Sequence, residues 1–362
     1  MRASEVRLAD DLTGRTVEVS TRARWLVGGA DDVRIEGFRM RHAANPAQNG
    51  ALNTDGRSRW TIVRNVLSDT HGPVVSIQGG TGHALLENDI SRSGQLGVHG
   101  TDASEVLVQG NRIYHNNLAG FDPVWEAGGL KMTVMSNLTL AGNDVSDNDG
   151  WGLWCDIDCR DTTIVDNRVH HNTRVGIAYE ISRRGTITGN MVWENGLEVS
   201  GWGRGAGIVC QNCTTTTIAD NLVAWCPDGI AVVEQEREII SRVEQVAVRG
   251  NTIVGADDTV ALGWLTDRAE EFLYRPGARN QGAENRHWFE AREGSSDRFD
   301  WAGPTSRLAE FNATPGEEGG HYLRTPRRRR SWRQPVYLLR PAPSGSRTPA
   351  LRIPDVVSGR SA

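Results

Sequence analysis

Lys131, Asp156 and Glu180 are the residues of this 362-residue chain whose types and spacing could perform chemistry together. Lys131 is the single lysine beside 39 arginines and lies in the segment WEAGGLKM, residues 125–132. A coding preference for arginine explains the 39 but does not explain the exception. Lysine differs from arginine in being a compact amine that can lose its proton. Carboxyl groups act as general acids and bases or bind cations, so the question is which elements bring the three side chains together.

A short pattern recurs through most of the chain and predicts how it folds. The pattern is apolar, any residue, apolar, two residues, Asn, any residue, apolar, as in WTIVRNVL at residue 60. Its asparagines are Asn65, Asn88, Asn111, Asn143, Asn167, Asn190, Asn221 and Asn251. Four gaps between them are 23 or 24 residues, and three longer gaps hold insertions. The alternation predicts strands too short to be stable alone, so we expect stacked coils of a parallel β-helix, with the asparagines forming a ladder.

A ladder of glycines, about one half-coil before the asparagines, sets the register of the outer face. Its members are Gly97, Gly129, Gly152, Gly176 and Gly207, and Gly152 lies one residue farther from its asparagine, which predicts a one-residue bulge. The residues one and three positions after each glycine are mostly apolar and are predicted to face inward, so those two and four positions after it face outward. The outward set along the axis is Asn53, Asp55, Ser76, Gln78, His99, Lys131, Trp154, Asp156, Glu180 and Gln211.

This register predicts one cluster. Lys131, Asp156 and Glu180 come from three consecutive coils, and strands stack about 4.8 Å apart, so the three should span about 10 Å, the size of one or two sugar rings. Asp158 is expected to join them. Two insertions, NLAGFDPVWEAGG and WENGLEVSGWGRGAG, should wall the face and form a groove. The residues predicted to bind a substrate there are His99, Trp125, Glu126, Trp154, Trp202, Arg204 and Gln211, because indoles stack on the apolar faces of sugars.

The segments GWGLWCDID (150–158) and GIAYEIS (176–182), preceded by EAGGLKM, carry a resemblance to a known group. The chain resembles the right-handed parallel β-helix repeat proteins of the pectate-lyase-like superfamily, over about residues 15 to 256 and more loosely to 323. The resemblance implies an all-β fold, a single-stranded right-handed parallel β-helix of about 9–11 coils with a short C-terminal cap. It also implies a secreted, bacterial, carbohydrate-active protein with a polysaccharide or oligosaccharide as its partner.

The resemblance further implies a polysaccharide lyase or epimerase acting on uronic-acid-containing glycans. Lys131 would then be the catalytic base, and Asp156, Asp158 and Glu180 would hold Ca²⁺. Nearby carboxylates raise the pKa of a lysine, so this chemistry requires a cation that neutralises them. A glycoside hydrolase that uses Asp156 and Glu180 on adjacent coils is a second reading. A non-catalytic carbohydrate-binding or adhesin-type coil is a third.

Composition and the chain ends set the remaining expectations. No run of about 18 apolar residues is present, which argues against a membrane span. The start, MRASEVRLADD, lacks the apolar segment of a signal peptide, so a secreted parent would be truncated here. Residues 1–256 are expected to form the β-helix, and 257–323 the last coils and a cap with a short helix around 305–312. Residues 324–362 are expected to form a disordered tail, because Pro, Ser, Gly and Arg dominate them. The acidic remainder of the chain disfavours nucleic acid as a partner.

The five cysteines, Cys155, Cys159, Cys210, Cys213 and Cys226, are an odd number without a flanking zinc-site pattern. We therefore expect buried thiols. A monomer is expected as well.

Overall fold

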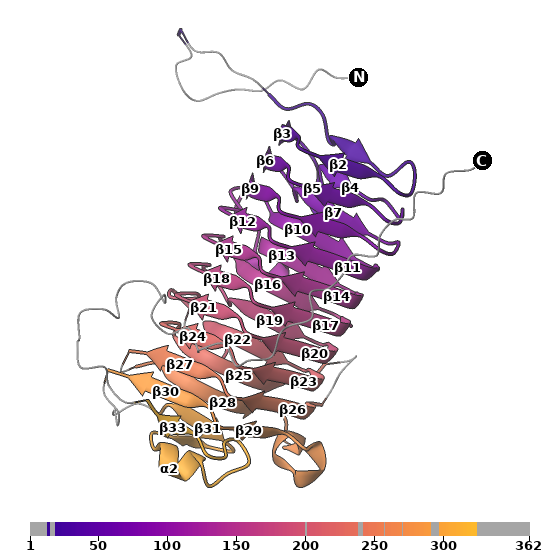
Figure 1. Cartoon of the computed structure of the whole chain (residues 1–362). Coiled ribbons are helices and arrows are strands. Elements are labelled where there is room, and N and C mark those ends of the chain that lie inside the picture. Colours follow the sequence, from indigo (N-terminus) through magenta and orange to yellow (C-terminus); the bar gives the residue numbers. More distant parts are fainter. Residues whose placement is uncertain are drawn as a thin grey trace. The chain divides into compact units, whose positions relative to one another are not determined.

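The computed structural model describes residues 13–14, 19–199, 201–237, 242–256, 258–269, 271–290 and 297–323. In the described range 26–323 the chain winds through three sheets in turn, one strand of each sheet per coil (Figure 1). All strand pairs but one are parallel, and the exception joins the last two strands of the first sheet. The predicted parallel β-helix is confirmed. The arginine-rich tail lies outside the described residues.

The strands fall into three sheets. Sheet 1 contains β1 (Leu26–Val27), β4 (Leu52–Asn53), β7 (Val75–Gln78), β10 (Leu96–Thr101), β13 (Gly128–Thr133), β16 (Trp151–Asp156), β19 (Ile177–Glu180), β22 (Ala206–Gln211), β25 (Asp228–Glu234), β28 (Val260–Thr266), β31 (Phe299–Trp301) and β32 (Pro304–Thr305). Sheet 2 contains β2 (Arg34–Glu36), β5 (Thr61–Val63), β8 (Ala84–Leu86), β11 (Ser104–Gln109), β14 (Ser136–Ala141), β17 (Arg160–Val165), β20 (Arg183–Thr188), β23 (Thr214–Ala219), β26 (Glu244–Arg249) and β29 (Gln281–Ala283). Sheet 3 contains β3 (Arg39–Ala43), β6 (Val66–Thr70), β9 (Asp89–Ser93), β12 (Arg112–Tyr114), β15 (Asp144–Ser146), β18 (Arg168–His170), β21 (Met191–Trp193), β24 (Leu222–Ala224), β27 (Thr252–Gly255), β30 (Arg286–Phe289) and β33 (His321–Tyr322).

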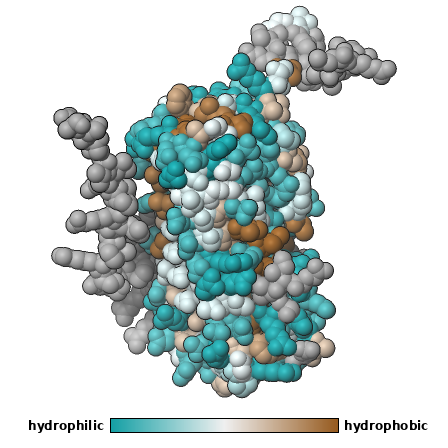
Figure 2. Space-filling view, turned by 90° about the vertical axis from the view of Figure 1, so that its right-hand side faces the viewer, coloured by the Kyte–Doolittle hydropathy of each residue, from teal (hydrophilic) through white to brown (hydrophobic). Residues whose placement is uncertain are grey.

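The core is the stack of inward-facing side chains from the three sheets. Each strand alternates, so that in sheet 2 the inner row Val108, Leu140, Ile164, Ile187 and Ile218 is buried in register. The outer row of the same sheet includes Thr139, Thr163, Thr186 and Thr217, also in register. Figure 2, which views the side of the molecule that bears this sheet, is mostly teal and white. The short strands of the described coils are stable because each coil buries the inward-facing side chains of the next.

The predicted asparagine ladder runs along the turn between sheets 2 and 3. Each Oδ1 accepts the backbone N–H and the Nδ2–H of the asparagine one coil earlier; Asn143, for example, donates both to Asn167 at 2.9 Å. Asn167 Nδ2 also donates to the carbonyl of Leu140. The members are buried, so the ladder satisfies polar groups that would otherwise be costly inside the turn.

A second ladder, which sequence reasoning missed, lies five residues after the first. It comprises Asn116, Asn148, Asn172 and Asn195, each accepting from its predecessor. Cys226 Sγ takes the next position and accepts the Asn195 backbone N–H at 3.4 Å. The sequence signal was available as Asn-x₄-Asn in four successive repeats.

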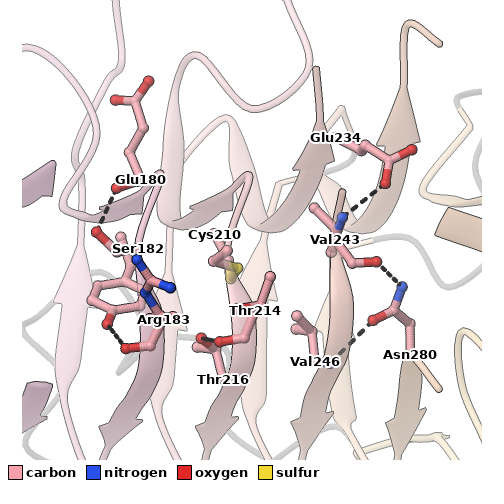
Figure 3. The surroundings of a disulfide bond; sticks show 12 residues. Glu180, Ser182, Arg183, Cys210, Thr214, Thr216, Glu234, Val243, Val246 and Asn280 are labelled. Atoms are coloured by element: carbon pink, nitrogen blue, oxygen red, sulfur yellow. Dashed lines mark hydrogen bonds between the residues drawn. A yellow bond between two sulfur atoms is a disulfide. The ribbon is translucent and has the colours of Figure 1, made fainter. Parts of the chain in front are cut away.

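The inward turn between sheets 1 and 2 corrects the cysteine prediction. Cys210 and Cys213 are joined by a disulfide, which Figure 3 shows with its surroundings, whereas free thiols were expected at both positions. The prediction failed because an odd cysteine count does not exclude one local pair. The remaining three, Cys155, Cys159 and Cys226, are buried free thiols as expected.

The described chain ends in a small non-repetitive unit. Two 3-10 helices, η1 (Phe272–Tyr274) and η2 (Pro276–Ala278), precede β29, and helix α2 (Leu308–Phe311) follows β32. Leu308 and Phe311 are buried against the core, and Phe311 stacks on Phe299 of β31 at 5.0 Å. Glu317 then terminates the first asparagine ladder, because its two carboxyl oxygens accept the backbone N–H and the Nδ2–H of Asn285. These residues cover the inner stack at this end, which an open solenoid requires.

Candidate functional site

The predicted outward register is confirmed in sheet 1. His99 pairs with Lys131, Lys131 with Trp154, and Trp154 with Ala178 on successive strands. Glu180 pairs with Gln211 in the same way. Asp156 follows Cys155, which pairs with Tyr179, so Asp156 and Glu180 occupy equivalent places on the adjacent strands β16 and β19.

The face is much less exposed than its pattern suggested. Lys131 and Asp156 are each 6% exposed and Glu180 is 8% exposed, although all three point away from the inner stack. The cover comes in part from the insertion before β13, which carries helix α1 (Pro123–Glu126). Asp122 caps α1 by accepting the Val124 N–H at 2.9 Å, and Trp151 donates its indole N–H to the Pro123 carbonyl at 2.8 Å. The insertion is thereby pinned across the outer face of β13 and β16.

Lys131 is surrounded by groups that favour a cation. Its Nζ lies 3.0 Å from Asp156 Oδ2 and donates to the Trp125 carbonyl at 3.1 Å. The same nitrogen lies 3.7 Å from the centre of the Trp154 ring, which is a cation–π contact. A compact ammonium fits this three-sided enclosure, whereas a planar guanidinium has a different shape and donor geometry. The enclosure therefore gives a physical reason for lysine at this one position.

Glu180 is held one strand away by donors on both sides. Trp154 Nε1–H donates to its Oε2 at 3.1 Å, and Gln211 Nε2–H donates to its Oε1 at 2.9 Å. Arg237, in the segment after β25, also reaches Oε1 at 3.3 Å. Burial, together with the neighbouring Asp156 carboxylate, raises the pKa of Glu180 to about 7 against the opposing effect of Arg237. Glu180 is thus protonated in a large fraction of molecules near neutral pH, while Asp156 is paired with a cation.

His99 and Glu126 form an imidazole–carboxyl pair beside Lys131. His99 Nε2 lies 3.2 Å from Glu126 Oε1, and His99 Nδ1 lies 3.4 Å from Ser76 Oγ. Burial lowers the pKa of His99, Glu126 opposes this effect and Lys131 adds to it, so the imidazole is neutral at pH 7. Glu126 also accepts from Gln48 Nε2–H at 2.6 Å. Glu126 was predicted to bind a substrate in the groove, but it is 4% exposed and turned toward His99.

Asp158 does not join this cluster. Its carboxylate is held by Arg160 and Arg183, and the hydrogen bond from Arg160 lowers the pKa of Asp158 to about 2. Ile157 and Asp158 both have positive φ, at 49° and 64°, and this turn separates the side chain from that of Asp156. Within the described residues, no three His, Cys, Asp or Glu side chains group closely enough to hold a metal ion. Asp156, Asp158 and Glu180 in this arrangement do not fit a Ca²⁺ site, because each of the three carboxyl groups is already matched with a basic side chain.

The predicted aromatic and basic substrate-binding residues differ in exposure and in position along sheet 1. Trp125 is 47% exposed at the edge of α1. Trp202 packs on β28, three strands beyond the Glu180 strand β19, where its ring occupies the space that a side chain on Gly263 would need, at 2.3 Å from an ideal Cβ. Arg204 is exposed in the same insertion. Trp154 is buried and packs with Ala178 and Val209, so it serves the site through its indole N–H and its ring face.

Several contributors were missed from the sequence. Gln48 and Gln95 fix Glu126, the latter by donating to its carbonyl at 3.0 Å. Arg237 lies in the long gap between two ladder asparagines, where the repeat gives no register. Gln235 accepts from Gln211 at 3.0 Å and completes the chain of amides beside Glu180.

Comparison with known proteins agrees with this architecture. Residues 50–221 match a family model described as "Right handed beta helix region". Among solved structures, XylC in complex with xylose has 13% identity and a TM-score of 0.49, covering 77% of this chain and 54% of that one. Pectate lyase Pel9A has 13% identity and a TM-score of 0.44, with coverage of 74% and 68%. The Azotobacter vinelandii mannuronan C-5 epimerase AlgE6 A-module has 11% identity and a TM-score of 0.46, with coverage of 83% and 88%.

The chain spans about half the length of the XylC structure. No curated protein sequence matches it. The described helices include none with the length and apolar character needed to cross a membrane. The chain is therefore a right-handed parallel β-helix protein, and residues 50–221 are similar to the right-handed beta helix family.

Proposed function

We propose that this protein binds a polysaccharide or oligosaccharide along the outer face of sheet 1 and hydrolyses a glycosidic bond there. Glu180 is the general acid and Asp156 the partner carboxylate. The observation that carries this proposal is that two carboxyl groups on adjacent strands have different partners: Asp156 on β16 lies 3.0 Å from the Lys131 ammonium, whereas Glu180 on β19 accepts from the neutral donors of Trp154 and Gln211. Pairs whose surroundings separate them in this way mark an acid and an ionised partner.

The environments assign the two roles. Burial raises the pKa of Glu180 to about 7, so it can deliver a proton to a leaving-group oxygen near neutral pH. Asp156 has the Lys131 ammonium at 3.0 Å, which stabilises its carboxylate as nucleophile or as electrostatic support for an oxocarbenium-like transition state. Adjacent strands are about 4.8 Å apart, a spacing that favours the shorter carboxyl separation of retaining enzymes.

The surroundings of the pair indicate where a sugar chain would enter. Trp125 is exposed on the α1 side, and the Arg237 side chain is 40% exposed on the other. A tryptophan ring at this rim offers an apolar platform to the face of a sugar ring. The buried disulfide supports an oxidising compartment, in agreement with an extracellular or periplasmic location.

β-Elimination or epimerisation at a uronic acid is a second candidate, favoured by one observation. His99 is a neutral imidazole on the strand next to Lys131, and such a group can remove a proton while the neighbouring ammonium attracts a substrate carboxylate. In this version the base is His99 and not Lys131, because Lys131 Nζ is engaged by Asp156 at 3.0 Å and by the Trp125 carbonyl at 3.1 Å. The reaction would have to displace Asp156 from Lys131 when the substrate carboxylate binds.

The test is a panel of neutral and uronic-acid polysaccharides incubated with the full chain, with and without a chelator. Hydrolysis predicts new reducing ends, no product absorbing in the ultraviolet through a new double bond, and resistance to chelator. Glu180→Gln should then lower kcat by about 100-fold or more, and Asp156→Asn should do the same, while His99→Gln retains turnover. Unsaturated products that disappear in His99→Gln would instead establish elimination. Glycan binding with no turnover in any condition would identify a non-catalytic binding coil, and full turnover by both carboxyl variants would refute the site.

A further inference from the structure

Cys155 and Cys159 take no part in the proposed chemistry, yet they bracket Asp156 in the sequence. Both are completely buried free thiols at the end of β16. Cys159 directly precedes β17 (Arg160–Val165), so the two thiols lie at the two ends of the short turn between β16 and β17. Cys159 Sγ also lies 3.4 Å from the Met132 carbonyl oxygen and 3.7 Å from that of Asp156. The pair therefore sits inside the coil, in the turn that carries the proposed catalytic carboxylate.

This pair occupies the same two positions of its coil as the disulfide does two coils later. Cys155 pairs in register with Tyr179, and Tyr179 pairs with Cys210. At the other end of the turn, Cys159 precedes Arg160 and Cys213 precedes Thr214, and these two following positions are aligned through Arg183. The coil therefore places Cys155 and Cys159 at the two positions that Cys210 and Cys213 bridge with Cα atoms 5.7 Å apart, a separation that suits a disulfide.

The earlier turn is one residue longer than the later turn, and it contains one more residue with left-handed backbone conformation. Cys155 and Cys159 are separated by three residues, whereas Cys210 and Cys213 are separated by two. Ile157 and Asp158 are both left-handed, while in the later turn Asn212 alone is left-handed, at φ 49°. Ile157 is 38% exposed while both cysteines are fully buried, so the longer turn projects outward between two inward-facing thiols.

We propose that Cys155 and Cys159 form a second disulfide by exchange with a low-molecular-weight disulfide. One cysteine loses its proton and its sulfur attacks the small disulfide, which forms a mixed disulfide and releases one small thiolate. The second cysteine then loses its proton and attacks the mixed disulfide, which joins Sγ to Sγ and releases the other small thiolate. Two electrons pass from the cysteine pair to the small disulfide, and the two protons are taken up by the small thiolates.

The bond would close a ring around Asp156, Ile157 and Asp158. It would thus restrict the backbone of the turn from which the Asp156 carboxylate reaches Lys131. The conformational freedom of this turn would then depend on whether Cys155 and Cys159 are oxidised or reduced. Cys226 does not compete, because its sulfur caps Asn195 in the turn after sheet 3. Since both thiols are buried, exchange requires local opening and is expected to be slow.

Trypsin separates the relevant cysteines without engineering. Cleavage after Lys131 and Arg160 releases residues 132–160, which contain Cys155 and Cys159 and no other cysteine. Cleavage after Arg204 and Arg237 releases residues 205–237, which contain Cys210, Cys213 and Cys226. Full-length protein is first reduced under native conditions, then equilibrated with oxidised and reduced glutathione, quenched with acid, unfolded, alkylated and digested.

Formation of the second disulfide predicts a 132–160 peptide that carries no alkyl group and is two hydrogens lighter than its dithiol form. The peptide 205–237, with one alkyl group, reports in the same sample that the first disulfide has re-formed. Two alkyl groups on 132–160 in that sample would overturn the proposal, and so would two glutathione adducts. Cys155→Ser provides the matched control, in which Cys159 should carry one alkyl group or one glutathione. Since the wild-type peptide gives the answer, the proposal stays testable if this variant does not fold.

Discussion

Lys131 and Asp156 meet across two adjacent strands, with Nζ 3.0 Å from Oδ2 and both side chains less than one tenth exposed. A buried pair of this kind costs desolvation on both sides, so its net contribution to stability is small, but breaking it leaves an unpaired buried charge. The pair also gives two neighbouring carboxyl groups different surroundings. Asp156 is paired with the Lys131 ammonium, whereas Glu180 accepts hydrogen bonds from the neutral donors of Trp154 and Gln211 and, at a longer distance, from Arg237. This asymmetry underlies the predictions below.

Lys131→Met should destabilise the protein by about 3 kcal/mol, because Asp156 loses its cation in a buried site. The free energy of unfolding from urea titration at pH 7 measures this loss. Lys131→Met with Asp156→Asn is the matched control and should recover most of it, since no buried charge remains. A loss below about 1 kcal/mol in the single variant would show that water reaches the pair freely.

Cleavage by the wild-type protein should decline as the pH rises through about 7, because burial raises the pKa of Glu180 to about 7 and the acid must be protonated. The measurement is kcat against pH on the substrate identified by the glycan panel. Glu180→Asp retains a carboxyl and should keep a shifted, weaker profile, whereas Glu180→Gln should abolish the activity. A wild-type rate that is flat from pH 6 to 8.5 would remove Glu180 from the role of acid.

Stability should also fall as the pH rises, through Glu317. Burial raises the pKa of Glu317 from 4.5 to about 7, against the hydrogen bonds from Asn285. An acid whose folded pKa is raised contributes stability that is fully present below pH 4.5 and is lost as the pH rises to about 7, here up to about 3 kcal/mol. Glu317→Gln keeps a neutral acceptor and should flatten the dependence of the urea midpoint on pH between 4.5 and 7.5.

Glu180 has its pKa raised over the same range, so Glu180→Gln is measured in parallel and the double variant should show the flattest profile. Nearby His287 does not supply the effect, because burial lowers its pKa to about 3. An unchanged slope in Glu317→Gln would mean that the end of the ladder is hydrated.

Asn167→Ala should cost about 3–5 kcal/mol, since it removes the acceptor of the Asn143 backbone N–H and of one Asn143 Nδ2–H inside the turn, and a donor to the Leu140 carbonyl. Thr163→Ala, four residues earlier on the outer row of the same coil, should change stability by less than about 0.5 kcal/mol. Urea unfolding of both variants provides the comparison. Equal effects would indicate that the ladder amides are replaced by water.

Trp125→Ala should weaken binding of the identified glycan by about tenfold, which corresponds to about 1.4 kcal/mol, through loss of an exposed ring. The Lys131 contact is to the Trp125 backbone carbonyl and survives the substitution. Trp125→Phe should restore part of the affinity. Calorimetric titration of the three proteins measures the difference, and equal affinities would exclude the α1 rim from the binding surface.

The repeat made most of the fold predictable. Period-two alternation and the asparagine spacing gave the parallel coils, and the glycine ladder gave the outward register of Lys131, Trp154 and Glu180. What failed depended on segments outside the repeat. Glu126 turned inward because α1 is pinned by Trp151, and Asp158 turned away because the turn after β16 contains two left-handed residues. Arg237 lies in an insertion without register, so its approach to Glu180 was not predictable.

The asparagine ladder has a consequence for how such a protein can vary. Each amide offers the same acceptor to the coil before it and the same donors to the coil after it, so one link is interchangeable with the next. The ladder therefore sets the pitch of the solenoid without setting the number of its turns. Whole coils can be gained or lost by duplication or deletion while every surviving contact is kept, and the ligand-bearing face changes length in steps of one strand spacing.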